Sequence, residues 1–350
     1  MRYSNGMRIG VIDVGSNNAQ LQVVNAFAGS PPLPFSAYKR PTVLGDEFTD
    51  DGGITKIGTK RVVSAVAAAL TKARGLELDQ LFLFATSAVR DATNRDEIVE
   101  AIVDRTGHRV QFLSGEEEAR LTYYAAHRWY GWSAGRLLLL DIGGGSMEVA
   151  LGCDAEAELA VSLPLGAGRL TRRFFSADPP GADEIEELAS HVRDSVRAVA
   201  DRLRWEGEHR RAVATSKTFK QLARLAGAPP QRDGPLVKRS LSLAQLDEWI
   251  PRLAGMPAIA RAKLRGVSAS RSKQVLAGAL IARNTMAALG IDTVDLCPWA
   301  LREGILLRYL QGLDKPRHLP LFSVTTGKAA LPEVPRQGHG TQKVSFHASM

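Results

Sequence analysis

The feature that most constrains this fold is a motif that occurs twice: a strand-like apolar segment that ends in Asp and a Gly-rich turn. The first copy reads Ile12-Asp13-Val14-Gly15-Ser16-Asn17, and the second reads Leu140-Asp141-Ile142-Gly143-Gly144-Gly145-Ser146. Further strand- and helix-like segments follow each copy. Two matched units that face one another predict a two-lobed α/β protein with a cleft between the lobes. We expect the first unit at 1–132 and the second, more basic unit at 133–297.

Hydrophobic spacing places the remaining elements. Strands are expected at 8–14, 21–27, 35–44, 81–85, 110–113, 136–142, 147–151, 159–163, 211–215 and 293–296. Helices are expected at 54–74, 93–106, 116–130, 168–175, 182–205, 217–225 and 298–310, and helical segments within 243–264 and 270–289. Residues 312–350 are rich in Pro, Gly, Ser and Lys and show no periodicity, so we expect a flexible tail there.

Composition excludes several classes of protein. The chain has 350 residues, of which 45% are hydrophobic and 23% charged, which is typical of a globular protein. Its two cysteines, Cys153 and Cys297, cannot form a disulfide framework or a zinc site alone. No apolar run approaches the roughly 20 residues that span a bilayer, and no secretion signal is evident. We therefore expect a cytoplasmic protein without a membrane partner.

The basic charge of the chain is concentrated in one segment. The formal net charge is +8, and residues 209–283 hold 15 Lys or Arg against 3 Asp or Glu. Solvated helical faces could account for single residues, but the imbalance of the whole segment favours a polyanionic partner, which its field would steer towards the protein. Nucleic acid, a nucleotide and polyphosphate all remain open on this evidence.

The second motif predicts a metal and phosphate site. If the strands around it form a hairpin, Asp141 lies opposite Glu148 with Cβ atoms about 5 Å apart. Two such carboxylates need a cation between them, and Mg²⁺ or Mn²⁺ prefers oxygen ligands of this kind. The turn residues Gly143, Gly144, Gly145 and Ser146 allow backbone N–H groups to converge on an anion.

The first motif repeats this geometry with one acid. Gln20 is expected opposite Asp13, so Asp13 is a further metal or water contact. Gly15, Ser16 and Asn17 form the second predicted phosphate clamp, because short polar side chains tolerate strained turns. The alternative for each motif alone is a plain hairpin, and the repetition after matched strands favours the phosphate site.

Three other segments add phosphate-binding or acidic groups. Thr86 and Ser87 follow a strand and precede Arg90, whose guanidinium suits bidentate contact with phosphate. Thr215 and Ser216 precede Lys217 in the same way. The third segment, 116–118, places three glutamates in the first turn of a helix, where a carboxylate could act as general base towards water. Helix capping and the helix dipole are the structural alternatives.

Four ordered motifs resemble those of the exopolyphosphatase/guanosine pentaphosphate phosphohydrolase (Ppx/GppA) family. They are Asp13-Val14-Gly15-Ser16-Asn17, Ala85-Thr86-Ser87-Ala88-Val89-Arg90, Ser114-Gly115-Glu116-Glu117-Glu118-Ala119-Arg120 and Asp141-Ile142-Gly143-Gly144-Gly145-Ser146. The resemblance implies two ribonuclease-H-like domains of the actin-like, sugar kinase and Hsp70 ATPase fold around an interdomain cleft. It also implies that helix 298–311 packs back on the first domain, and that the protein is a short, two-domain member that forms a homodimer.

The resemblance also implies an activity and roles for residues. The activity is Mg²⁺-dependent release of terminal phosphate from polyphosphate, with guanosine pentaphosphate as the alternative substrate. The catalytic glutamate falls on Glu117, with Glu116 and Glu118 left open, and the cleft arginine on Arg90; Asp141 and Glu148 fall on the metal ligands. The basic side chains expected to guide the polymer are Lys217, Lys220, Arg239, Arg265 and Arg271. No DNA partner is expected, and a weakly catalytic regulator that binds polyphosphate or guanosine penta- or tetraphosphate and an actin-like kinase are the other rivals.

Overall fold

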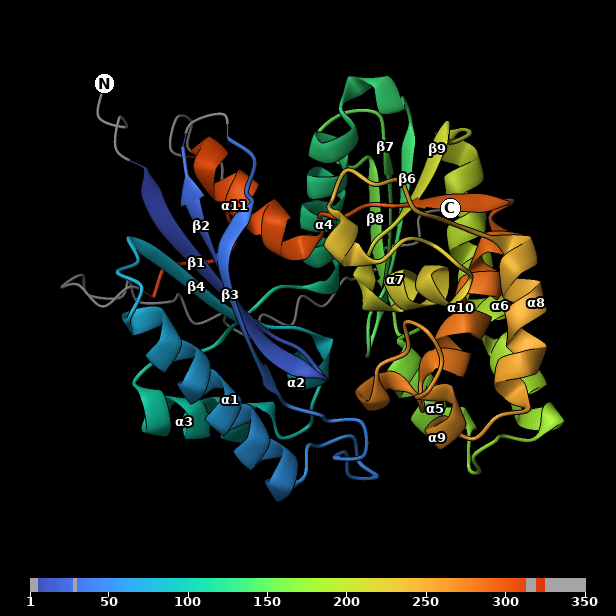
Figure 1. The fold of residues 1–350 in the computed structure, drawn as a ribbon, viewed down its shortest axis with the longest axis horizontal. Coiled ribbons are helices and arrows are strands. Elements are labelled where there is room, and N and C mark those ends of the chain that lie inside the picture. Colours follow the sequence, from blue (N-terminus) through green and yellow to red (C-terminus); the bar gives the residue numbers. More distant parts are fainter. Residues whose placement is uncertain (1–5, 28–29, 313–318, 325–350) are drawn as a thin grey trace, which may run out of the picture.

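The computed structural model describes residues 6–27, 30–312 and 319–324, which form two α/β lobes side by side (Figure 1). The first lobe has a five-stranded sheet in the order β3-β2-β1-β4-β5. β1 pairs antiparallel with β2, and β2 with β3, whereas the pairs β1–β4 and β4–β5 are parallel. The strands are β1 (Met7–Val14), β2 (Asn18–Ala26), β3 (Pro34–Pro41), β4 (Gln80–Ala85) and β5 (Gln111–Phe112).

The second lobe repeats this topology. Its six-stranded sheet has the order β10-β11-β9-β6-β7-β8, and the series β8-β7-β6-β9-β11 matches β3-β2-β1-β4-β5 in order and direction. The strands are β6 (Leu137–Ile142), β7 (Met147–Gly152), β8 (Leu159–Leu163), β9 (Arg211–Ala214), β10 (Ser240–Ser242) and β11 (Thr293–Leu296). The prediction of two ribonuclease-H-like domains is confirmed; β10 was not predicted.

Helices cover the outer faces of both sheets. In the first lobe α1 (Lys56–Arg74) and α3 (Arg95–Thr106) pack on the face of the sheet that carries Ile12 and Val14. In the second lobe the outer helices are α5 (Ala167–Phe174), α6 (Ala182–Glu206), α7 (Ser216–Leu225), α8 (Leu243–Ala254) and α10 (Val275–Ala288). The helical segments expected within 243–264 are α8, which ends before Gly255, and the short α9 (Ala258–Arg261), which begins after Pro257. A further short helix, α2 (Ser87–Arg90), was not predicted.

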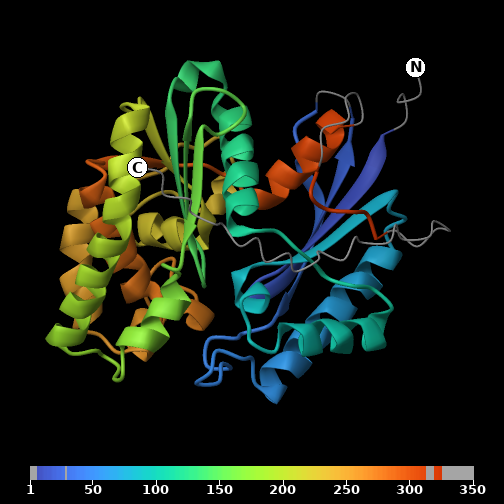
Figure 2. The ribbon, with the colours of Figure 1, turned by 180° about the vertical axis from the view of Figure 1, so that it is seen from behind.

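Two helices lie between the sheets, and both views show them there (Figures 1 and 2). Tyr123 of α4 (Gly115–Tyr130) packs against Leu137 and Leu139 of the second sheet. Ile305 and Leu306 of α11 (Leu301–Gly312) pack against the inner face of the first sheet. The sequence boundary at 132 assigns α4 to the first unit, whereas the helix packs mainly on the second. These inner faces are where the candidate site lies.

Part of the predicted flexible tail has a fixed place in the structure. Val324 donates its N–H to the Leu81 carbonyl at 2.7 Å, and the Gln111 side chain bonds both backbone groups of Phe322. Residues 319–324 therefore lie along the first lobe, because these hydrogen bonds extend its edge; the rest of the predicted tail, apart from Gly312, lies outside the described residues. None of the described helices is long and apolar enough to cross a lipid bilayer.

Candidate active site

Strand register builds two rows of polar side chains, one on each sheet. In the second lobe Asp141 lies opposite Glu148, and Glu148 lies opposite Ser162. In the first lobe Asp13 lies opposite Gln20, and Gln20 lies opposite Lys39. Both predicted hairpin registers are thus confirmed.

Both rows face the layer between the sheets. Alternation along a strand puts Asp141 on the same face as Leu137 and Leu139, which contact α4. It likewise puts Asp13 on the same face as Ile9 and Val11, which contact α11. The two polar rows therefore meet at one place, beside the N-terminal ends of α4 and α11.

In the second lobe Glu148 is buried and Asp141 half-buried, and hydroxyl groups anchor both acids. The Thr215 hydroxyl donates to Asp141, and the Ser162 hydroxyl donates to Glu148 at 2.9 Å. Burial raises the pKa of Asp141 to about 6; burial and the charge of Asp141 raise the pKa of Glu148 to about 7. Loss of water contact disfavours the charged forms of both groups, so a bound cation would be strongly favoured here.

The glutamate that faces these acids is Glu118, whereas the sequence prediction placed the general base at Glu117. The Glu117 carboxylate turns back to accept the Ser114 N–H at 2.7 Å, while the Ser114 hydroxyl accepts the Glu117 N–H at 3.2 Å. This reciprocal cap occupies Glu117 at the start of α4. Glu118 is 5% exposed, and burial and the charge of Glu148 raise its pKa well above the ordinary value.

Arg90 binds Glu118 and orients it. Its guanidinium donates to the Glu118 carboxylate, to the Leu113 carbonyl at 3.0 Å and to Asp91 at 2.9 Å. Arg90 also lies close enough to Glu148 for the two charges to interact. The structure therefore brings Arg90 into the acidic centre, as a side chain with a fixed direction.

Asp13 completes the centre from the first lobe. Its Oδ2 lies 3.5 Å from a guanidinium nitrogen of Arg302, at the start of α11. Its Oδ1 is buried and has no hydrogen-bond partner among the described residues, and burial raises the pKa of Asp13. Arg302 was not predicted as a site residue.

The predicted phosphate loops meet across the cleft. A Cβ on Gly144 would collide with the Ser16 hydroxyl, and one on Gly145 would lie 2.6 Å from the Ser87 hydroxyl. The Asn17 amide donates to the Ser16 hydroxyl at 3.1 Å, and Thr86 directly precedes the short helix that carries Ser87 and Arg90. Glycine at 144 and 145 is needed because a side chain there would hold the two loops apart.

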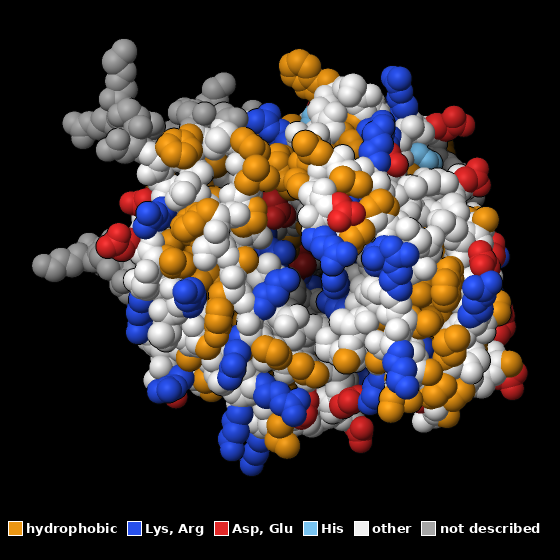
Figure 3. Space-filling model, in the orientation of Figure 1, with side chains coloured by type: hydrophobic (Ala, Val, Ile, Leu, Met, Phe, Trp, Pro, Cys, Tyr) orange, Lys and Arg blue, Asp and Glu red, His pale blue; other side chains and the backbone are white. Residues whose placement is uncertain are grey.

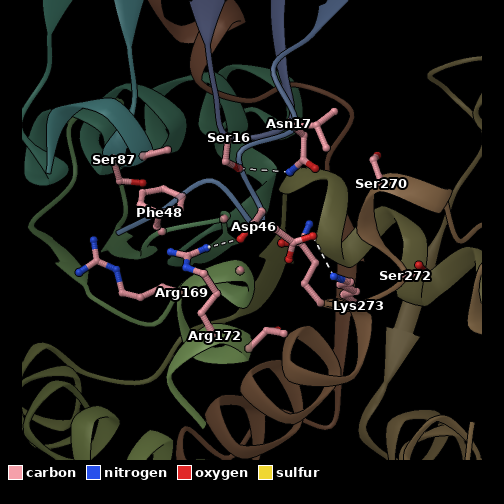
Figure 4. Close-up of a pocket in the computed structure, with 18 of the residues that line it drawn as sticks. Ser16, Asn17, Asp46, Phe48, Ser87, Arg169, Arg172, Ser270, Ser272 and Lys273 are labelled. Atoms are coloured by element: carbon pink, nitrogen blue, oxygen red, sulfur yellow. Dashed lines mark hydrogen bonds and ion pairs between the residues drawn. The ribbon is translucent and has the colours of Figure 1, made fainter. Parts of the chain in front are cut away.

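A cavity of about 380 Å³ lies on the other side of these loops (Figure 4). Ser16, Asn17, Ser87, Gly144 and Gly145 form its inner wall. Contacts between the lobes enclose it: Lys273 binds Asp46 at 2.8 Å, Arg169 binds Asp91 at 2.7 Å, and the Arg172 guanidinium lies 3.9 Å from the centre of the Phe48 ring.

The predicted polymer-guiding residues separate into two groups. Lys220 donates to the Pro298 carbonyl at 3.3 Å, and Lys220 and Arg271 both lie near Asp141. Arg239 is 8% exposed and donates to four carbonyl groups within 229–237, so it stabilises that turn and is not available to a polymer. Arg265 is exposed and lies beside Arg224. Arg224 is in the last turn of α7, at the end of that helix remote from Asp141. Charge along the chain predicted Arg239 wrongly because it carries no information on side-chain direction; Arg265 stays a prediction.

The residues at the centre fit a divalent cation that a phosphate would help to hold. Among the described residues no group of three Asp, Glu, His or Cys side chains is arranged to bind a metal unaided. Asp141 and Glu148 lie opposite one another, and the unpartnered Oδ1 of Asp13 lies nearby. Two carboxylates plus substrate oxygens are a usual environment for Mg²⁺.

The amino-acid sequence of the chain matches a family model and known proteins. A model of the Ppx/GppA phosphatase family matches residues 23–312. Exopolyphosphatase 1 of Mycobacterium tuberculosis (strain H37Rv) is 47% identical over 304 residues, which cover 87% of this chain and 88% of that protein. Exopolyphosphatase 1 of Mycobacterium leprae is 46% identical over 304 residues, which cover 87% and 90%.

Solved structures agree with the sequence relatives. The Ppx/GppA family member of Aquifex aeolicus superposes with a TM-score of 0.72 at 25% identity, covering 89% of this chain and 100% of that one. An exopolyphosphatase from Cytophaga hutchinsonii has the same fold, with a TM-score of 0.79 at 22% identity and coverage of 87% and 98%. The chain belongs to the Ppx/GppA phosphatase family.

Proposed function

We propose that the protein is an exopolyphosphatase that hydrolyses the terminal phosphoanhydride bond of inorganic polyphosphate and releases orthophosphate. The observation that carries the proposal is the position of Glu118: a buried carboxylate, fixed by Arg90, beside the opposed acids Asp141 and Glu148. The relatives named Exopolyphosphatase 1 support the same activity.

In the proposed reaction a water oxygen attacks the terminal phosphorus, and the bond from that phosphorus to the bridging oxygen breaks. Glu118 accepts the water proton, because burial makes its carboxylate a stronger base than an exposed glutamate. The shortened polymer leaves with the bridging oxygen. Glu118 takes the role first predicted for Glu117.

The loops and cations hold the phosphoryl group while its charge is redistributed. We propose that the backbone N–H groups of 16–17 and 144–146 and the Arg90 guanidinium bind its oxygens; the N–H groups of Gly15 and Gly143 close their own turns by donating to Asn18 and Ser146. Mg²⁺ held by Asp141 and Glu148, with Asp13 near, would supply positive charge at the reacting phosphate. Positioning and electrostatic stabilisation account for most of the rate in transfers of this kind.

Guanosine pentaphosphate is the second candidate substrate. The cavity beside the loops contains the Phe48 ring, with Arg172 stacked on it, next to Ser16 and Gly144. An aromatic and cationic surface next to phosphate-binding loops suits a nucleoside whose phosphates reach those loops.

Phosphate release from long-chain polyphosphate, guanosine pentaphosphate and ATP, each with Mg²⁺ and with EDTA, tests the proposal. We expect rapid Mg²⁺-dependent release from polyphosphate, and a separation of at least tenfold in kcat/KM between it and the nucleotides. Faster hydrolysis of guanosine pentaphosphate would assign the site to the nucleotide. Absence of release from every phosphoanhydride would refute the activity.

A further inference from the structure

We infer that Lys39 of the first lobe, with Lys217 and Arg271 of the second, forms a cross-lobe clamp for the polyphosphate units that follow the terminal one. The inference rests on the proposed function and goes beyond it, because it assigns the selection of a polymer to residues of both lobes. Lys39 carries no predicted role, and it lies outside the basic segment 209–283.

Lys39 is placed by the register of the first sheet. It is the third member of the row Asp13–Gln20–Lys39, on the sheet face covered by α11. Asp13 lies at the reacting centre, so the row leads outward from that centre to the exposed strand β3. Lys39 also lies near Arg302. Burial lowers the pKa of the lysine, and the positive charge of Arg302 lowers it further.

Lys217 is placed by the start of α7. The Thr215 side chain donates to Asp141, and the Thr215 N–H donates to the Leu140 carbonyl at 3.0 Å. Ser216 has a φ of 67°, a left-handed value that is uncommon for a residue other than glycine. Lys217 follows this bend in the first turn of α7 and lies near Lys39 of the first lobe. The Thr218 hydroxyl fixes the turn to the Ile142 carbonyl at 2.8 Å.

Lys220 and Arg271 extend the same surface. Lys220 lies on the same side of α7 as Lys217, one turn further on. Arg271 lies near both Lys217 and Asp141, and burial lowers the pKa of Arg271 to about 10. The second lobe thus presents cations from α7 and from the segment before α10.

The positive charges of Lys39 in the first lobe and Lys217 in the second lie close enough to act on one another. Burial lowers the pKa of Lys217, and the positive charges of Lys39, Arg271 and Lys220 lower it further. Within the described ranges neither Lys39 nor Lys217 forms an ion pair, whereas on the other side of the loops Lys273 and Arg169 each pair with an aspartate of the first lobe. Figure 3 shows Lys and Arg side chains of both lobes around the hollow between them, with acidic side chains in its depth.

Binding of a linear polyanion would neutralise the repulsion between the positive charges of the two lobes. Its phosphates carry charge at regular intervals, so one chain can contact cations of both lobes while its end reaches Asp141. Polymer binding would then draw the lobes together and weaken as salt screens the charges. Orthophosphate and other short anions cannot bridge the lobes and reach the centre at once.

Lys39→Glu tests the clamp, with Arg40→Glu as the matched control. Arg40 is the next residue of β3, also exposed, on the opposite face of the strand. With long-chain polyphosphate we expect Lys39→Glu to raise KM at least tenfold with kcat within about threefold of wild type, and to flatten the salt dependence of kcat/KM. Arg40→Glu should leave KM within twofold, and tripolyphosphate should respond less to Lys39→Glu than the long polymer does.

A binding measurement without turnover complements the kinetics. In EDTA, long-chain polyphosphate should raise the Tm of the wild type and of Arg40→Glu, and raise that of Lys39→Glu markedly less. Without polymer at low salt, Lys39→Glu should melt at or above the wild-type Tm, because a repulsion between the lobes becomes an attraction. Lys39→Met serves as the second variant if the charge reversal impairs folding.

Failure of the proposed function and failure of the clamp would give different results. A wild type that releases no phosphate from polyphosphate overturns the proposed function itself. A wild type that is active, with Lys39→Glu and Arg40→Glu equal in KM and in polymer-induced Tm, overturns the clamp alone. An equal rise in KM for tripolyphosphate and for long polymer would place Lys39 at the terminal phosphate and also contradict the clamp.

Discussion

At the scale of single residues, adjacent glutamates of one helix turn do different work. Glu117 closes the cap of α4 through Ser114, and Glu118 turns into the buried centre, where Arg90 holds it. The difference follows from helix geometry, because successive residues point about 100° apart around the axis. If the helix began one residue earlier, Glu116 would fall at the capping position and Glu117 at the position that faces the centre.

Glu118→Gln should lower kcat on polyphosphate by at least 100-fold, because the amide keeps the size of the side chain but cannot accept the water proton. Glu117→Gln is the control: glutamine serves equally well in this cap, so its kcat should stay within twofold of wild type. Phosphate release under saturating polymer measures both. Loss of activity in Glu117→Gln alone would return the base to Glu117.

Asp141→Asn should weaken Mg²⁺ binding, because the neutral amide removes half of the opposed carboxylate pair. We expect the Mg²⁺ concentration for half-maximal activity to rise at least tenfold, and the Mg²⁺-induced increase in Tm to disappear. Asp96→Asn, on an exposed face of α3, should behave as wild type. An unchanged Mg²⁺ titration in Asp141→Asn would contradict the metal assignment.

At the scale of elements, α4 and α11 join the lobes by a close crossing. A Cβ on Gly304 would collide with the Leu121 carbonyl, so the two helices approach to backbone contact there. Arg308 of α11 reaches Glu156 in the β7–β8 connection with two hydrogen bonds, one of 2.8 Å, and stacks on Tyr124. The same helix brings Arg302 to Asp13, so its position matters for both stability and chemistry.

Gly304→Ala should destabilise the protein by about 3 kcal/mol, at the upper end of overpacking costs, because the obstacle is backbone and cannot rotate away. Denaturant unfolding measures the loss. The shift of α11 should also reduce kcat through Arg302. Gly75→Ala is the control, since its nearest neighbour would be 3.7 Å away; equal stability of the two variants would show that α11 moves freely at the crossing.

At the scale of the whole molecule, exposed ion pairs connect the two lobes on the cavity side. The Arg169–Asp91 and Lys273–Asp46 pairs connect lobe to lobe, and their side chains are between 36% and 73% exposed. Solvent-exposed pairs contribute about 0–1 kcal/mol each. They can shift the balance between open and closed lobes without governing unfolding.

The double variant Arg169→Met/Lys273→Met should therefore keep its Tm within about 5 °C of wild type. Its radius of gyration from X-ray scattering should nevertheless increase as the lobes separate. Arg109→Met removes an ion pair to Glu100 within the first lobe and should leave the radius unchanged. An unaltered radius in the double variant would show that the hairpin loops and helices alone keep the cleft closed.

The sequence was most informative where chemistry and local register coincide. The pairs Asp141–Glu148 and Asp13–Gln20 were predictable because a short Gly-rich turn between two strands leaves few registers. The choice between Glu117 and Glu118 was not, because the phase of a helix depends on which residue caps it. Arg239 was misassigned and Lys39 overlooked for one reason: the direction of a side chain is set by strand and turn geometry that a count of charges along the chain does not contain.

The matched rows of the two sheets differ in chemistry, with Asp141–Glu148–Ser162 on one side and Asp13–Gln20–Lys39 on the other. Inorganic polyphosphate has no such polarity, since its two termini are identical. The protein is unsymmetrical but the polymer is symmetrical, so either end of a polyphosphate chain can enter the site. Each polyphosphate molecule has two equivalent ends, and it is shortened from the end that enters the cleft first.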